Sequence, residues 1–171
     1  MENIKSKFKK TNESLRSSNR VTFVVIITSL LYLVLFSFHF VLGLIREKDI
    51  VWFDFPGKDE GVILIFIQTL IFAPLFETLL NQTLPYYLLN KVKYLNERSY
   101  LILLSSALFF GLEHFYSLFY ILYGFLMGLV FMYGYMVRIK SDKKTFYLIA
   151  ICHFLVNLGL FIRNLLVNAF S

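Results

Sequence analysis

Five long apolar segments constrain the fold of this chain more than any other feature of its sequence. They cover about residues 21–45, 62–89, 100–117, 118–137 and 145–168. Each is close to the roughly 20 apolar residues that an α-helix needs to cross a membrane. In lipid a helix satisfies its own backbone hydrogen bonds, and these segments are too long for the strands of a barrel. The sequence therefore predicts an all-α fold, a polytopic membrane helical bundle of about five transmembrane helices.

Composition supports a membrane location and excludes several other classes of protein. Hydrophobic residues make up 58% of the chain, well above the range of soluble domains. The single cysteine, Cys152, excludes a disulfide framework and a thiolate metal cluster. The first apolar segment is longer than the core of a signal peptide and lacks a small-residue cleavage site, so we expect it to remain as a span. Basic residues are split among short segments, so we expect membrane lipids as partners and no nucleic acid.

The connections between the segments carry most of the charge. Residues 1–20 hold six Lys and Arg against two Glu, 90–99 hold three against one, and 138–144 hold four against one Asp. Residues 46–60 instead hold three Lys and Arg against five Asp and Glu. The positive-inside rule then places the N-terminus and the two later basic connections in the cytoplasm, and the C-terminus outside. We therefore expect a basic cytoplasmic N-terminal tail, followed by a multi-pass membrane domain over residues 21–171.

Three ionisable side chains lie well inside the apolar segments. A charged group at mid-bilayer costs about 2.5–3.5 kcal/mol on an insertion scale, so such residues are rare unless they have a function. Counted from the expected cytoplasmic ends at about 1.5 Å per residue, Glu77 lies at about 18 Å, His114 at about 21 Å and His153 at about 14 Å. Asn157, one turn beyond His153, lies at about 20 Å. The similar depths on three segments predict a common site.

The second apolar segment carries further polar residues beside Glu77. Asn81 shares the face of Glu77, while Thr78 and Gln82 form a second polar pair one step round the helix. Such a concentration of polar side chains in one span predicts a locally hydrated helix that can hold a working carboxylate.

Two prolines, Pro74 and Pro85, bracket this polar patch. Each proline removes one helical hydrogen bond and favours a kink. In an α-helix these losses should leave the carbonyls of Leu70 and Asn81 free for water or side chains.

Other polar or small residues in the spans have a structural interpretation. Gly124 and Gly128 have the spacing that lets two membrane helices approach closely. His39 is expected to form an interhelical hydrogen bond, and Glu113 to face water or a headgroup near the outer end of its span. Cys152 is expected to belong to the core. We therefore place none of these residues in the site.

The order and spacing of these motifs resemble the CPBP family. This family comprises the type II CAAX prenyl endopeptidases and bacterial relatives described as bacteriocin-processing, self-immunity or abortive-infection (Abi) proteins. It carries EExxxR, FxxxH and HxxxN in separate spans, with a glycine-containing span before the last. Here residues 77–82 read ETLLNQ, 110–114 read FGLEH, 123–128 read YGFLMG and 153–157 read HFLVN. The similarity covers about residues 62–160, the expected catalytic core.

The first motif departs from the family pattern at two positions. Thr78 stands where the family has its second glutamate, and Gln82 stands where it has arginine. Both ends of an ion pair are thus neutral together, which leaves no uncompensated charge in lipid. Because the two positions are one helical turn apart, we expect a hydrogen bond between Thr78 and Gln82.

The resemblance implies an intramembrane endopeptidase, a hydrolase that cleaves a peptide bond in a membrane-associated peptide or protein. In this interpretation Glu77 is the general base that activates a water molecule. His114 positions the water, and His153 and Asn157 donate hydrogen bonds to the oxyanion. This version requires no cofactor. The supporting residues are Thr78, Asn81, Gln82 and Phe110.

Three alternatives stay open. Zinc could be held by Glu77, His114 and His153 with water at the open position, although the chain lacks HExxH and we favour the metal-free version. A non-catalytic membrane scaffold or bacteriocin self-immunity protein is favoured by Thr78 and Gln82. A proton or cation path would use the same ionisable residues, but the sequence shows no internal repeat. The expected location is the cell membrane, specifically a bacterial plasma membrane.

Overall fold

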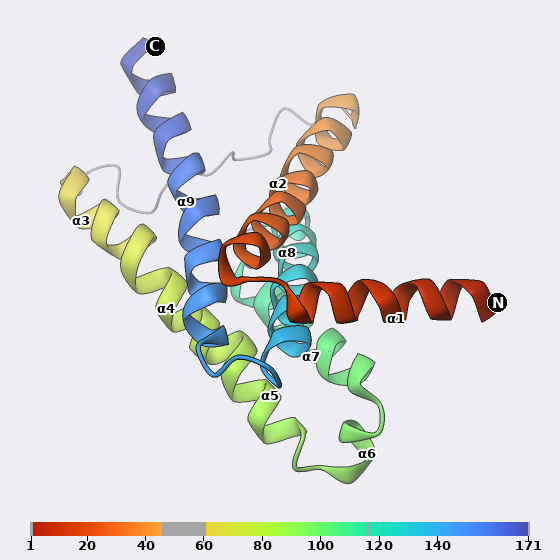
Figure 1. The fold of residues 1–171 in the computed structure, drawn as a ribbon. Helices are drawn as coiled ribbons and strands as arrows, with labels where there is room; N and C mark the ends of the chain where they lie inside the picture. The colour runs from red at the N-terminus through yellow and green to blue at the C-terminus, as the bar shows by residue number, and fades with distance from the viewer. Residues whose placement is uncertain (1, 46–60, 116, 171) are drawn as a thin grey trace.

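The structure is a computed structural model that describes residues 2–45, 61–115 and 117–170. Within these ranges every regular element is a helix, which confirms the all-α prediction. Figure 1 shows the elements in chain order: α1 (Glu2–Ser17), α2 (Arg20–Ile45), α3 (Val62–Ile67), η1 (Gln68–Phe72), α4 (Ala73–Thr78), η2 (Leu79–Thr83), α5 (Leu84–Leu89), α6 (Lys93–Asn96), α7 (Ser99–Glu113), α8 (Leu118–Arg138) and α9 (Thr145–Phe170). The acidic connection 46–60 lies outside the described residues.

Four helical segments are long and apolar enough to cross a membrane, which confirms the polytopic bundle. They are Arg20–Leu44, Val62–Leu89, Leu118–Arg138 and Thr145–Leu166. The fifth apolar helix, α7, has only 15 residues. At 1.5 Å per residue it spans about 22 Å, which is less than the roughly 30 Å of a hydrocarbon core.

This short helix ends earlier than the sequence predicts. The backbone of His114 leaves the helical region at φ −99° and ψ 46°, so α7 ends at Glu113 rather than at residue 117. Ser117 then caps α8, because its hydroxyl accepts a hydrogen bond from the amide of Tyr120 at 3.1 Å. A serine in this position satisfies an N–H that would otherwise have no partner at the start of a helix. The chain therefore turns back inside the expected span.

The core forms where α2, α8 and α9 meet. Side chains from these three helices are buried against one another; they include Phe23, Ile27, Phe131, Ile149 and Val156. α7 packs along α8, and the long bent helix from α3 to α5 crosses α9 through η1 and α4. This arrangement brings the second, third and fifth apolar segments together (Figure 1).

Glycines allow α7 and α8 to cross at very short range. A Cβ on Gly128 would lie 2.9 Å from Cα of Ala107, and one on Gly124 would lie 3.1 Å from Cα of Gly111. A Cβ on Gly111 would lie only 2.7 Å from the carbonyl oxygen of Ile121. Any larger residue would push the two backbones apart, so the predicted packing role of Gly124 and Gly128 is confirmed.

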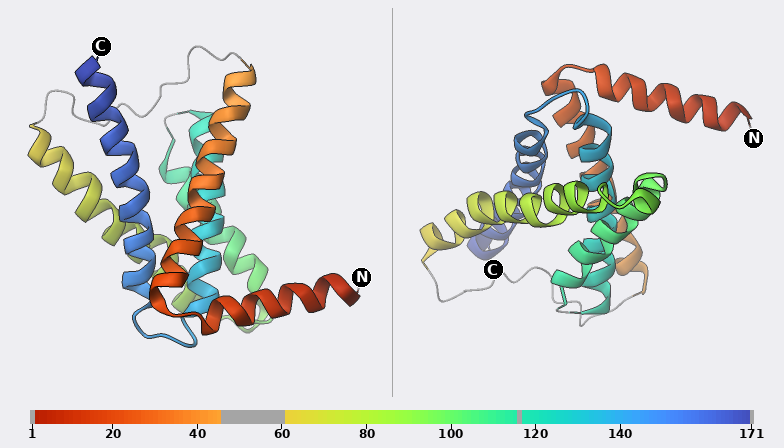
Figure 2. Two further views of the ribbon diagram at one scale, coloured as in Figure 1. Left: turned by 45° about the horizontal axis from the view of Figure 1, so that its top comes forward. Right: turned by 90° about the horizontal axis from the view of Figure 1, so that it is seen from below.

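The basic connections lie together at one end of the bundle. Figure 2 shows the start of α2, the turn from α8 to α9 and α6 at this end, and the C-terminus at the other. Arg20 joins two of these segments, because its Nε donates to Asp142 Oδ2 at 2.7 Å. The grouping agrees with the alternation of charge along the sequence. That this end faces the cytoplasm stays a prediction.

Candidate active site

Glu77 lies on a helical turn that two π-helical turns bracket. The π turn η1 precedes α4, and a second one, η2, follows it. The amide of Ala73 donates to the carbonyl of Gln68, five residues earlier, and the end of η2 has the same pattern. Pro74 and Pro85 each follow shortly after one of these turns. Such turns interrupt the regular helical ladder and are frequent at functional sites.

Side chains from two other helices bond carbonyls next to these turns. In η1 each N–H bonds the carbonyl five residues earlier, so Pro74, which has no N–H, leaves the carbonyl of Thr69 without a backbone donor. Asn157 Nδ2 donates to this carbonyl at 3.0 Å. The sequence predicts that the carbonyl of Leu70 loses its donor, because that prediction holds for an α-helical register, with bonds to the fourth residue before. The hydroxyl of Ser106 on α7 donates to the carbonyl of Asn81, which confirms that this carbonyl is bonded by a side chain. The bent helix is therefore held by both α9 and α7.

The structure places Glu77 next to His153, and both His114 and His153 next to the ring of Phe110. His153 Nε2 lies 3.6 Å from Glu77 Oε2. The ring centroid of Phe110 is 4.8 Å from that of His114 and 6.0 Å from that of His153. Phe131 packs on His153 at 4.8 Å, and only 6% of the surface of His153 is exposed. A carboxylate and two imidazoles thus share an aromatic-walled interior.

The position of His114 is fixed by the end of α7. Its Nδ1 lies 2.7 Å from the carbonyl oxygen of Phe110. Because a carbonyl can only accept, Nδ1 carries the hydrogen of this bond, and Nε2 of the neutral ring is an acceptor. A Cβ on Gly124 would lie 3.3 Å from the ring, and the ring of Tyr120 packs at 5.3 Å. The helix end, the glycine and the tyrosine together orient the imidazole.

Thr78 and Gln82 do not form the hydrogen bond that the sequence predicts. Their exposed fractions are 0% and 1%, yet Thr78 Oγ1 and Gln82 Nε2 have no hydrogen-bond partner among the described residues. The prediction was therefore wrong. A physical reason lies in η2, which begins at Leu79, because a π turn between the two positions alters the regular i, i+4 geometry.

Glu113 contacts the site although the sequence placed it outside. Asn81 Nδ2 donates to Glu113 Oε2 at 2.7 Å, so the carboxyl does not simply face water. This bond joins the polar face of the bent helix to the residue directly before His114. Counting residues along α7 could not predict this bond, because the contact depends on how two distant segments cross.

His39 is on α2, where its Nδ1 lies 2.6 Å from the carbonyl of Leu35 in the same helix.

A metal site receives no support from this geometry. In the described part of the chain, no three His, Cys, Asp or Glu side chains are grouped so that they could hold a metal ion. Cys152 is buried in the core, as expected. The metal-free version and the zinc alternative both stay predictions.

A comparison with known protein families shows the family of this chain. The model of the family described as type II CAAX prenyl endopeptidase Rce1-like matches residues 59–159, which is more than half of the 171 residues. The chain belongs to this family. Searches among curated proteins and among solved structures find no significant match. The Rce1-like match confirms the resemblance to the CPBP family and covers every residue of the site.

Membership in the Rce1-like family has two direct consequences. The family consists of intramembrane proteases, so it supports peptidase activity and, with the apolar helices, a multi-pass membrane protein. The Rce1-like chain nevertheless has Thr78 and Gln82 in place of a charged pair, and both side chains are buried. Any catalysis by this chain therefore depends on the remaining residues of the site.

Proposed function

We propose that this Rce1-like chain is an intramembrane endopeptidase in which Glu77 activates a water molecule. The observation that carries the proposal is the position of Glu77 Oε2, which lies 3.6 Å from His153 Nε2 and has no hydrogen-bond partner among the described residues. A buried carboxylate oxygen without a partner is costly, so a purely structural role does not explain it. At 3.6 Å the two atoms are too far apart for a direct hydrogen bond, so Glu77 Oε2 is free to accept a proton from a water molecule.

The mechanism assigns each side chain to one task. Glu77 takes a proton from water while the water oxygen attacks the scissile carbonyl. His114 orients this water through Nε2, and His153 donates from Nε2 to the oxyanion. Asn157 has a second N–H hydrogen beyond the one given to Thr69, and it assists His153. When the C–N bond breaks, Glu77 returns the proton to the leaving nitrogen.

A pair of substitutions tests this assignment. Glu77→Gln and His114→Ala are compared with wild type in membranes that contain a candidate peptide. We expect Glu77→Gln to lower hydrolysis by about 10²- to 10⁴-fold, because it removes the general base. Glu97→Gln is the matched control, since Glu97 is exposed on the connection before α7. Hydrolysis that survives both site substitutions would contradict the proposal.

The choice of peptide follows from the family and from the genome. One probe is a farnesylated peptide that ends in a CAAX sequence, which the family description suggests. The other probes are peptide precursors encoded beside the gene of this protein, such as a bacteriocin or a peptide pheromone. Addition of a chelator then separates the metal-free mechanism from the zinc alternative, because only the latter should lose activity.

A non-catalytic scaffold or self-immunity protein is the second candidate. The observation that favours it is the loss of both charges at Thr78 and Gln82. A scaffold should bind its peptide or protein partner equally well with and without the Glu77 carboxylate. Unchanged binding by Glu77→Gln, together with no hydrolysis by wild type, would support this candidate and exclude the endopeptidase.

A further inference from the structure

Helix α1 lies crosswise to the other long helices at the basic end of the bundle. Figures 1 and 2 show that it runs sideways from the start of α2 and that its N-terminal half projects beyond α8. The sequence predicted only a basic tail for residues 1–20. In the structure Glu2–Ser17 is helical, and its direction differs from that of every long apolar helix.

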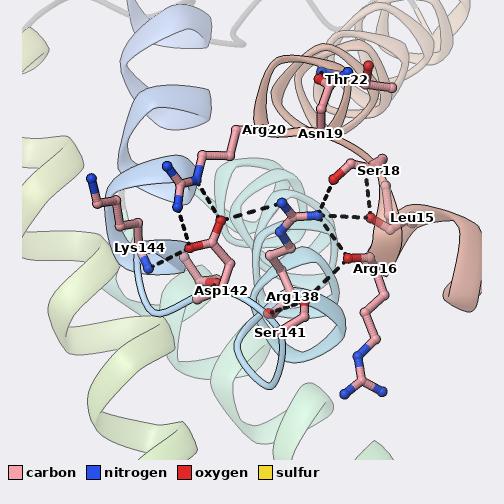
Figure 3. A network of polar contacts seen from close by, with 11 residues as sticks. Leu15, Arg16, Ser18, Asn19, Arg20, Thr22, Arg138, Ser141, Asp142 and Lys144 are labelled. Carbon is pink, nitrogen blue, oxygen red and sulfur yellow. Dashed lines mark hydrogen bonds and ion pairs between the residues drawn. The ribbon is translucent and has the colours of Figure 1, made fainter.

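A charged network fixes this direction of α1 (Figure 3). Arg138, at the end of α8, donates from Nη1 to the carbonyls of Arg16 at 2.9 Å and Ser18 at 2.6 Å. A cation at the C-terminal end of a helix is also stabilised by the helix dipole. Asp142 accepts two bonds from Arg20, at 2.7 and 3.1 Å, and one from Arg138 at 3.4 Å. The hydrogen bonds from Arg20 lower the pKa of the Asp142 carboxyl, so the network is charged at neutral pH.

One face of α1 packs on α8 and continues beyond it. Leu15 is buried, and Tyr133 on α8 donates a hydrogen bond from its hydroxyl to Asn12 Oδ1 at 2.6 Å. Phe8 lies on the same face as Leu15, two turns earlier. Its ring centroid is 6.4 Å from that of Tyr133, but 59% of its surface remains exposed. An apolar side chain is thus presented on the side of α1 that faces the membrane-embedded bundle.

Lysines surround this exposed phenylalanine. Lys7 and Lys9 lie on either side of it and Lys10 on the opposite face, and all three are exposed. Further exposed lysines lie on the basic connections at the same end of the bundle: Lys91, Lys93, Lys140, Lys143 and Lys144. A surface with this charge attracts the anionic headgroups of a membrane leaflet.

We propose that α1 lies in the membrane–water interface and binds anionic phospholipid headgroups. Phe8 then reaches the boundary of the acyl chains, Lys7 and Lys9 contact phosphates from the sides of the helix, and Lys10 adds positive charge close to the leaflet. Interfacial helices combine these features, a narrow apolar face and a lysine-rich polar face with low net hydrophobicity. Lysine side chains are long enough to extend toward the headgroups from the sides of the helix. The Arg138 and Asp142 network holds α1 in the plane that this binding needs.

Hydrogen exchange of α1 tests the proposal with the full chain in bilayers. The protein is reconstituted in phosphatidylcholine alone and in phosphatidylcholine with phosphatidylglycerol, and the amides of residues 6–17 are followed. We expect exchange to be at least about tenfold slower with phosphatidylglycerol, because lysines near an anionic surface stabilise the bound helix. The difference should disappear when Lys7, Lys9 and Lys10 are all changed to glutamine.

A matched triple variant distinguishes the effect of the α1 lysines from the effect of the other lysines at the basic end. Changing Lys91, Lys93 and Lys140 to glutamine removes the same charge but leaves α1 intact, so the slower exchange should remain. Equal exchange in the two lipids, or slowing that survives the α1 variant, would overturn the proposal. If exchange in α1 slows with a higher protein-to-lipid ratio and not with phosphatidylglycerol, the proposal is overturned and α1 contacts a second copy of the chain instead.

Discussion

The basic end of the bundle and the mid-membrane site differ in how their buried polar groups are satisfied. At the basic end, Asp142 accepts hydrogen bonds from Arg20, Arg138 and the amide of Lys144, and only Nε of Arg138 has no partner in the described network. Around Glu77, several buried polar atoms have no partner among the described residues: Glu77 Oε2, Thr78 Oγ1, Asn81 Oδ1 and Gln82 Nε2. The first network is nearly saturated, whereas the second keeps unused hydrogen-bonding capacity.

This difference separates a structural network from a candidate reactive one. A buried polar group without a partner costs about 1–3 kcal/mol, so a network that only holds the fold should be paired. Atoms that bind water and substrate must instead keep donors and acceptors free. Substitutions at the basic end should therefore lower stability, and substitutions near Glu77 should mainly lower hydrolysis.

The largest loss of stability is expected for Arg138→Ala. Removing this buried cation takes one donor from each of the carbonyls of Arg16 and Ser18 and one partner from Asp142. We expect the free energy of unfolding to fall by about 3 kcal/mol, as for other buried ion pairs that lose one member. Thermal unfolding in detergent measures it. Arg138→Lys should lose less, and a loss no larger than that of the exposed Lys140→Ala would contradict the structural role.

Gly111→Val should lower both stability and hydrolysis, because this residue belongs to the helix crossing and also lies near His114. A Cβ there would lie 2.7 Å from the carbonyl oxygen of Ile121, so the helices must separate. Overpacking of this kind costs about 1–3 kcal/mol. Gly43→Ala is the control, since its Cβ would meet nothing within 4 Å. Normal hydrolysis by a destabilised Gly111→Val would show that the crossing does not position His114.

The sequence predicts the spans and the depth of the site because both depend on local features. Apolar length and charged connections give the helix boundaries to within a few residues, except that α7 ends at Glu113, before Ser117 caps the next helix. The rise per residue then predicts that Glu77, His114 and His153 reach a similar level. The structure places these three side chains next to the ring of Phe110 or to one another.

The remaining contacts of the site could not be predicted, since they depend on the crossing of distant helices. The five-residue register of η1 makes Thr69 the partner of Asn157, and nothing in the local pattern distinguishes this register from an α-helical one. The bond between Asn81 and Glu113 joins residues on two different helices. The direction of α1 likewise depends on Arg138, which is more than a hundred residues away.

Asn157→Leu and Ser106→Ala form a matched pair with a moderate effect on stability. Each removes the side chain that bonds a carbonyl of the bent helix, at Thr69 and Asn81 respectively. We expect each to lower the free energy of unfolding by about 1–2 kcal/mol. Only Asn157→Leu should also lower hydrolysis beyond this effect, because Asn157 is assigned to the oxyanion. Equal hydrolysis by the two variants would limit Asn157 to a positioning role.

Thr78→Val should have the smallest effect on stability. It is therefore the sharpest test of the difference between the paired network at the basic end and the unpaired polar atoms around Glu77. Thr78 Oγ1 is buried and has no partner among the described residues, so replacing the hydroxyl by a methyl group of similar size breaks no hydrogen bond. We expect thermal unfolding to stay within about 0.5 kcal/mol of wild type, while hydrolysis falls about tenfold through the loss of one hydrogen bond to water or substrate. Thr28→Val on α2 is the control, because Thr28 Oγ1 is also buried but lies outside the site. A clear loss of stability with unchanged hydrolysis would show that the Thr78 hydroxyl is structural. The distinction between a saturated and a reactive network would then fail at Thr78, a position where the chain departs from the family motif.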